Sequence, residues 1–188
     1  ALRIREGLAR LQDQGPANLL HRALATFTSG AHRNRAEERV HEFVRAMEAL
    51  AAPGDGQKYR RTFRSRTRLF FGKEADRLLR RLYRVKRRAG HARDVLDLYE
   101  GLGDGFSRRV ALWHDAVTAE VLARTLLKRV LLSPDLWEHL CFEAGIERFF
   151  SKAFDQVERT RIWGRAIDVD AARGAFRRGV VQPVDSEL

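Results

Sequence analysis

Apolar side chains recur every three or four residues along most of the chain, which is the spacing of one face of an α-helix. In the stretch 33–51 the residues on one side are Val40, Phe43, Val44, Met47 and Leu50. The strongest break is Pro-Gly-Asp-Gly at 53–56. The pattern predicts an all-α, bundle-like fold of about eight helices around one core.

The other helical segments follow from the same spacing and from helix-capping residues. They are expected at 4–11, 16–27, 59–71, 73–89, 106–130, 134–144, 146–157 and 169–176. Phe106, Val110 and Trp113 are expected on the buried side of the long helix, and Gly145 is expected to end the helix that Pro134 begins. We expect a single domain over 1–179 and a polar tail over 180–188.

Charge is concentrated in the segment 58–93, called the basic segment below. It holds 15 Lys or Arg and only two acids, Glu74 and Asp76, so its net charge is 15 − 2 = +13. The whole chain carries +11, and the other residues therefore sum to −2. A local field of one sign attracts a partner of the opposite sign.

A helix over 73–89 would separate charged from apolar side chains. At about 100° per residue, Leu78, Leu82 and Val85 fall on one face, and the cations except Lys86 fall opposite. Lys86 is expected to extend its amine out to solvent from the apolar side. If the two faces are independent, replacing Arg77, Arg81, Arg84 and Arg88 together should weaken binding and leave stability nearly unchanged.

The stretch 59–71 fits either a helix or a strand. In a helix its arginines share one side, with Arg66 alone among the aromatic residues; in a strand they alternate with apolar and hydroxyl residues. We favour the helix because no other segment offers a partner strand. Both interpretations place most of the arginines together.

Binding to RNA or DNA through the phosphate backbone is the function that this pattern favours, without readout of base sequence. The candidate contact residues are Arg60, Arg61, Arg64, Arg68, Lys73, Arg77, Arg80, Arg81, Arg84, Arg87 and Arg88. A nucleoprotein assembly is one setting for such a protein. The main alternative is an adaptor subunit whose basic face meets an acidic protein, or a second copy of the chain.

An enzymatic alternative comes from Arg109-Val-Ala-Leu-Trp-His114, which resembles the Arg-to-His signature of HEPN ribonucleases. That resemblance would imply metal-independent RNA cleavage. Arg35 to His41 and Arg84 to His91 also fall within the range of spacings that the signature allows, and three matches are about the number expected by chance in a chain with so many arginines. The sequence therefore favours a binding protein over an enzyme.

A second resemblance covers Arg81 to Leu102 (RLYRVKRRAGHARDVLDLYEGL), which is similar to the first repeat of CHAD domains. It implies a helical basic bundle that binds polyphosphate. The second half of the chain shows no matching repeat. Polyphosphate is therefore kept as an alternative ligand.

Other chemistry has weak signals. Glu38 with His41, and Asp135, His139 and Glu143, have spacings that a metal site could use, but exposed acids explain them equally well, so no metal or cofactor is predicted. The single cysteine, Cys141, cannot form an internal disulfide. We expect no membrane span and a cytoplasmic location, because there is no long apolar run and no signal-peptide core.

Overall fold

The computed structural model describes residues 18–51, 59–91 and 94–181. Predictions made for 1–17, for the break at 53–56 and for 182–188 lie outside this part of the chain. Every regular element in the described ranges is a helix, which confirms the all-α prediction. The elements are α2 (Leu19–Ala31), α3 (Ala36–Ala51), α4 (Tyr59–Phe71), α5 (Asp76–Ala89), the 3-10 helix η1 (Leu96–Leu102), α6 (Gly105–Leu132), α7 (Pro134–Leu140), α8 (Glu143–Phe150), α9 (Gln156–Trp163) and α10 (Val169–Val181).

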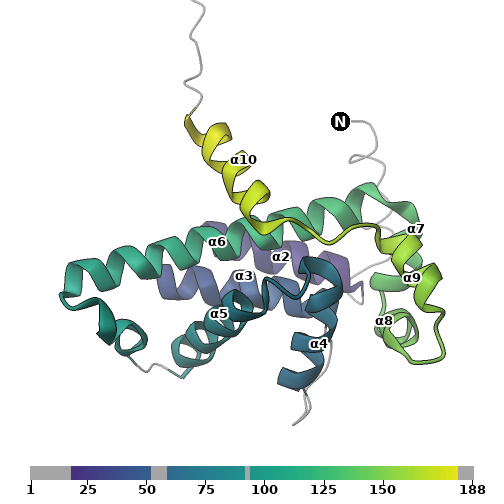
Figure 1. Cartoon of the computed structure of the whole chain (residues 1–188), viewed down its shortest axis with the longest axis horizontal. Coiled ribbons are helices and arrows are strands. Elements are labelled where there is room, and N and C mark those ends of the chain that lie inside the picture. Colours follow the sequence, from purple (N-terminus) through teal and green to yellow (C-terminus); the bar gives the residue numbers. More distant parts are fainter. Residues whose placement is uncertain (1–17, 52–58, 92–93, 182–188) are drawn as a thin grey trace, which may run out of the picture.

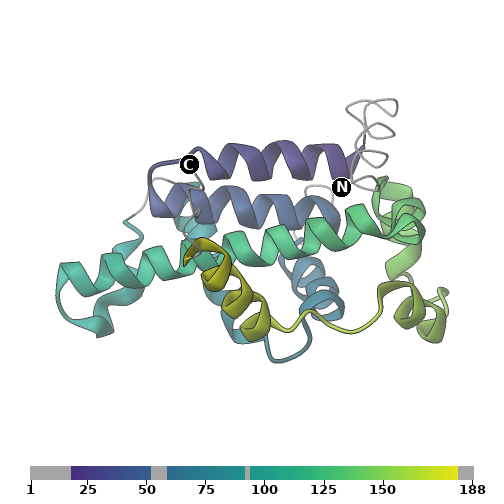
Figure 2. The ribbon, with the colours of Figure 1, turned by 90° about the horizontal axis from the view of Figure 1, so that it is seen from above.

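The long helix α6 is the spine of the molecule. Its 28 residues extend over about 42 Å at 1.5 Å per residue. Helices α2, α3 and α6 lie side by side (Figure 2). On another side of α3 lie α4 and α5, and α7, α8 and α9 gather beyond the C-terminal end of α6 (Figure 1).

The helices meet in one continuous apolar core. Its fully buried side chains include Phe43, Phe70, Leu82, Leu122 and Phe149. Close packing of α2 against α3 requires a glycine, because a Cβ atom at Gly30 would stand 2.9 Å from Cε1 of Phe43. Burial of this apolar surface is the main stabilising contribution to the fold.

The two helices of the basic segment form as the sequence predicts. Residues 59–71 are helical, so the strand alternative is wrong. Helix α5 ends before Gly90 as predicted but begins at Asp76 rather than at 73, because residues 72–75 form a turn. At the far end of the chain, α10 continues to Val181, so the predicted tail begins inside a helix. Figure 1 shows α10 starting beside α6 and pointing away from the rest of the molecule.

Helix boundaries in the C-terminal third differ from the prediction. Gly145 does not end a helix but lies inside α8, because the chain has already left the helical conformation at Phe142. The carbonyl of Cys141 instead accepts a hydrogen bond from the backbone N–H of Leu19 (2.7 Å). The predicted helix 146–157 is likewise split, and the side chain of Asp155 caps the new helix α9.

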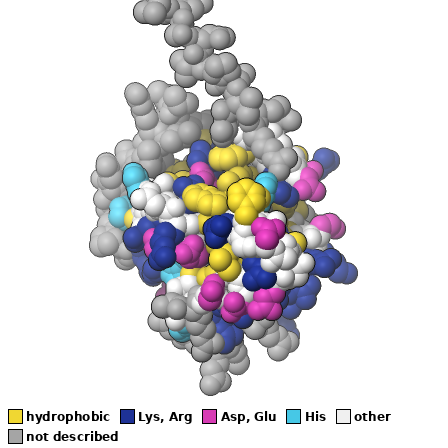
Figure 3. Space-filling model, turned by 90° about the vertical axis from the view of Figure 1, so that its left-hand side faces the viewer, with side chains coloured by type: hydrophobic (Ala, Val, Ile, Leu, Met, Phe, Trp, Pro, Cys, Tyr) yellow, Lys and Arg dark blue, Asp and Glu magenta, His cyan; other side chains and the backbone are white. Residues whose placement is uncertain are grey.

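The predicted buried side of α6 is wrong in its first half. Phe106 is 70% exposed, and Val110 and Trp113 are also exposed. The side that is buried carries Asp115, Thr118 and Glu120 among its apolar residues. Apolar spacing therefore selects the wrong face, because polar side chains enter the interior. Figure 3 shows hydrophobic side chains gathered at the surface of this end of the molecule, bordered by charges of both signs.

Two truncations on α6 should separate the buried from the exposed side. Leu122→Ala removes a fully buried side chain and should lower the free energy of unfolding by about 2 to 5 kcal/mol. Phe106→Ala removes a mostly exposed ring and should change it by less than about 0.5 kcal/mol. Urea unfolding followed by circular dichroism measures both. Equal losses would contradict this assignment of the α6 faces.

Candidate polyanion-binding surface

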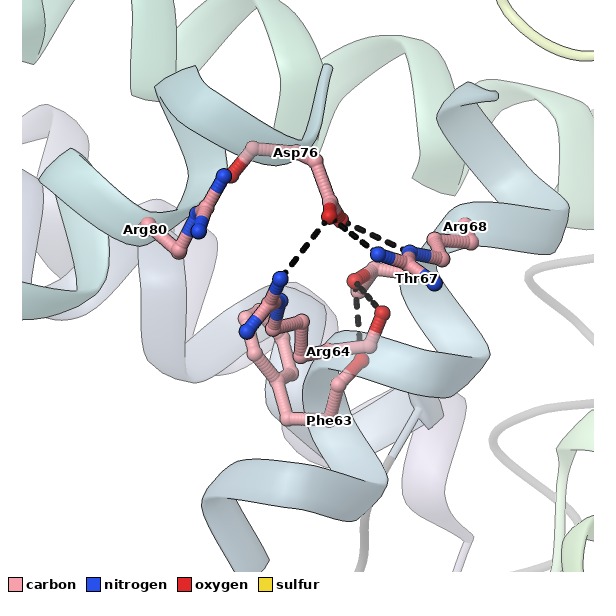
Figure 4. Close-up of polar contacts among 6 residues, drawn as sticks. All are labelled: Phe63, Arg64, Thr67, Arg68, Asp76 and Arg80. Carbon is pink, nitrogen blue, oxygen red and sulfur yellow. Dashed lines mark hydrogen bonds and ion pairs between the residues drawn. The ribbon is translucent and has the colours of Figure 1, made fainter. Parts of the chain in front are cut away.

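The arginines of α4 converge on an acid of α5. Arg68 makes a two-pronged contact with Asp76, its Nε donating to Oδ1 at 2.9 Å and its Nη2 to Oδ2, while Nη2 of Arg64 donates to Oδ2 at 3.1 Å (Figure 4). Nε of Arg80 donates to the backbone carbonyl of Asp76 (3.2 Å). The two guanidinium groups hold the pKa of Asp76 well below its usual range against the opposing effect of burial. This contact joins α4 to α5.

Arg66 lies on the opposite side of α4. It makes two hydrogen bonds to Glu147 of α8, at 2.8 and 2.6 Å, and its guanidinium lies 4.9 Å from the centre of the Phe150 ring. These contacts lower the pKa of Glu147. The one arginine that the helical pattern placed among aromatic residues thus has a structural role.

Arg81 neutralises a buried acid of α6. Its Nη2 donates to Oδ1 of Asp115 (2.6 Å), and the hydroxyl of Tyr99 donates to Oδ2 (2.6 Å). The Asp115 side chain is 2% exposed, whereas that of Arg81 is 50% exposed. Burial and the bond to Asp115 raise the pKa of Tyr99 far above its ordinary value. Arg81 is therefore part of the fold as well as of the surface.

The position of the Lys86 amine differs from the prediction. Its amine does not extend to solvent but contacts the carboxylate of Glu48 on α3 at 3.0 Å. The Glu48 side chain is 4% exposed, so it requires a nearby cation.

Arg88, near the end of α5, bonds the backbone carbonyl of Asp94 (2.9 Å) and the carboxylate of Asp97 (3.3 Å). The acidic residues that follow α5 thus partner Arg88.

Five cations of the basic segment are exposed and have no carboxylate partner among the described residues. Arg80 bonds the backbone carbonyl of Asp76, which leaves Lys73, Arg77, Arg84 and Arg87. We call these four the cationic row. Lys73 lies in the turn before α5, and along the helix the row extends from Arg77 to Arg87, about 15 Å at 1.5 Å per residue. Arg60 and Arg61 lie in the first turn of α4, and their side chains are outside the described part. Of the eleven residues predicted to contact a ligand, Arg64, Arg68, Arg81 and Arg88 thus pair with acids of the protein itself.

A cleft of about 740 Å³ adjoins the row, between α5 and residues 166–173. Its basic lining residues are Arg77, Arg81, Arg84 and Arg173. The segment opposite α5 is anchored by a hydrogen bond from the N–H of Ile167 to the carbonyl of Phe70 (2.8 Å). Sequence reasoning missed this wall, because no signal in the chain pairs Ile167 or Asp168 with a helix some 90 residues earlier. We call this space the α5–α10 cleft.

The residues of the Arg109-to-His114 ribonuclease pattern and of the candidate metal patterns do not line the α5–α10 cleft. Arg109 lines another cleft, of about 730 Å³ beside η1, but His114 does not line it. His139 stacks on the ring of Phe149, with centroids 5.2 Å apart. Within the described ranges, no cluster of three or more His, Cys, Asp or Glu could hold a metal ion.

Comparison of the chain with known protein families, curated proteins and solved structures finds no match. The local resemblances to HEPN ribonucleases and CHAD domains therefore rest on the residues quoted above. None of the described helices combines the length and the apolar character that a bilayer crossing needs.

The contact of Asp76 with Arg64 and Arg68 should depend on pH. Because the pKa of Asp76 is lowered in the folded state, its stabilising effect is complete above the unfolded value of about 3.9 and is lost as the pH falls below it. Asp76→Asn should therefore be less stable than the wild type at pH 7, and the difference should shrink at lower pH. Thermal unfolding across this range tests it. Asp170→Asn, which changes a 94% exposed side chain, is the control; a difference independent of pH would contradict the assignment.

Arg81 and Arg77 should differ in their effect on stability. Arg81→Ala leaves Asp115 buried without its cation and should cost about 1 to 3 kcal/mol, less than for a fully buried pair because Arg81 is half exposed. Arg77→Ala removes an exposed cation and should cost less than about 0.5 kcal/mol. Denaturant unfolding measures both. A larger loss of stability for Arg81→Ala would mean that a cation on the charged face of α5 also stabilises the fold. Equal losses for the two variants would contradict this role of Arg81.

Proposed function

We propose that the protein binds nucleic acid through the surface of α5, by contacts to the phosphate backbone. The observation that carries the proposal is the cationic row. Acids elsewhere in the described fold pair with Arg64, Arg68, Arg81, Lys86 and Arg88 but leave these four exposed cations uncompensated. Like charges on one helix repel each other, and a polyanion removes that repulsion.

The geometry of the row suits a regularly charged strand. Its helical part, about 15 Å long, corresponds to about four phosphates at 3.4 Å each, which is similar to the number of cations in the row. Binding to phosphates releases condensed counterions, which gives affinity that falls steeply with salt. Phosphate contacts position a protein on a nucleic acid without reading the base sequence, so we expect little preference among base sequences.

An acidic protein or polyphosphate would also be attracted to the row. Nucleic acid is favoured over polyphosphate because the α5–α10 cleft places apolar and acidic groups beside the arginines, where a ligand with charges alone gains nothing. These two alternatives are outcomes of the experiment below. RNA cleavage gains no support, because His114 does not line the cleft that Arg109 lines, and RNA is expected to remain intact.

The test is fluorescence anisotropy with labelled RNA and DNA over a range of salt concentrations. For a duplex, log affinity should fall against log salt with a slope of about −4, from about −0.9 for each of four phosphate contacts. Arg77→Ala with Arg84→Ala should flatten the slope by about two units. The matched control is Arg148→Ala with Lys152→Ala, which removes two exposed cations at α8 and should leave the slope unchanged.

Two results would contradict the proposal. One is the absence of salt-dependent binding to any RNA or DNA. The other is an equal loss of affinity in the double variant of α5 and in its α8 control, which would mean that net charge alone governs binding. Unfolding curves for both variants check that each remains folded.

A further inference from the structure

The α5–α10 cleft combines three kinds of lining. Arg77, Arg81 and Arg84 follow one another along α5 at spacings of four and three residues, so they point from one side of that helix. The apolar lining that a ligand can reach comes from the partly exposed Leu78 and Val169, whereas Phe71 and Ile167 are almost fully buried behind it. A third group is acidic. It consists of Glu74, Asp168 and Asp170.

The acidic side chains are held near the cleft and keep acceptor capacity. Asp168 accepts the N–H of Ala171 at the start of α10 (2.9 Å), which occupies one of about four lone-pair sites on its carboxylate. Asp170 contacts Arg173 only at 3.7 Å and is almost fully exposed. Glu74 folds back over Gly72, where φ is +76° and a Cβ atom would stand 2.6 Å from Oε2 of Glu74.

This combination disfavours a ligand that is anionic throughout. Inorganic polyphosphate would bring oxygens toward Asp168 and Asp170 and would leave the apolar wall unused. A duplex presents phosphates outward and keeps its bases stacked and paired, so it reaches the row but not the interior of the cleft. A group that is apolar on its faces and carries N–H donors on its edge would use all three linings.

An unpaired nucleobase has that chemistry. Its faces pack on apolar side chains, and its amino group can donate to a carboxylate, as in the pairing of Asp or Glu with cytosine N4. The volume of about 740 Å³ is within the range of about 300 to 1,000 Å³ that is usual for small-ligand sites. Arg77 to Arg84 extends about 10 Å, enough for two or three successive phosphates.

We infer that the preferred ligand is single-stranded nucleic acid, with phosphates on Arg77 and Arg84 and one base inserted between Leu78 and Val169. The inference rests on the proposed function, since it assigns the ligand class to the same surface. Arg81 adds no net charge to the cleft, because Asp115 already neutralises it. It lines the cleft and offers a ligand the guanidinium N–H groups that do not bond Asp115. The carboxylates of the cleft give the site its selectivity for a base over a further phosphate.

The experiment compares four probes at one salt concentration: a labelled single-stranded RNA, the same strand in a duplex, an abasic sugar-phosphate strand of equal length, and inorganic polyphosphate as competitor. The single strand should bind about tenfold more tightly than the duplex or the abasic strand, the order expected for one held base. Polyphosphate should compete poorly with it.

A cleft-blocking variant locates the effect. Ala166 is exposed and lines the cleft, so Ala166→Trp should fill the space without disturbing the core. It should abolish the preference for the single strand and leave duplex binding unchanged. Ala153→Trp, at an exposed alanine in the turn between α8 and α9, is the matched control and should keep the preference.

The outcomes distinguish a failure of the proposed base site from a failure of the proposed phosphate-binding function. Equal binding of single strand, duplex and abasic strand would overturn the base site and leave the phosphate-binding function intact. Preference for polyphosphate, or a preference for the single strand that survives in Ala166→Trp, would also overturn the base site. Failure of every nucleic-acid probe to bind would overturn the proposed function itself.

Discussion

The pairing of buried carboxylates with cations from neighbouring helices is the constraint on which the structure depends. Four carboxylates, those of Glu48, Asp76, Asp115 and Glu120, are at most 10% exposed. Each contacts a Lys or Arg of another helix, and Arg39 reaches Glu120 at 2.5 Å. An unpaired buried charge would cost several kcal/mol, so these contacts fix how α3, α4, α5 and α6 meet.

The same constraint decides which cations stay exposed on the candidate surface. Each buried acid takes a cation out of the field that a ligand would meet, so the surface charge is what remains after the interior is neutralised. On α5, Arg81 and Lys86 serve the interior, whereas Arg77 and Arg84 face solvent. The dense run of arginines on one helix therefore divides into residues that neutralise buried acids and residues that face solvent, and the side-chain partners decide to which group each residue belongs.

The C-terminal third adds shape to this charge. The chain returns from α9 past the end of α4, is anchored where Ile167 bonds Phe70, and then starts α10 beside α6. Its passage converts the exposed side of α5 into one wall of a cleft with an opposite wall of different chemistry. In the proposed base site, selectivity thus comes from residues far from the basic segment in sequence.

The sequence by itself determined the helical class, the helices of the basic segment and the outward direction of Arg77, Arg84 and Arg87, because these follow from local periodicity. Only the tertiary structure decided the inward pairing of Arg81 and Lys86, the exposure of Phe106 and Trp113, and the wall formed by residues 166–173. Those features depend on contacts between segments distant along the chain. The period of a helix records which side chains share a face, but not which face another helix covers or which carboxylate meets a given cation.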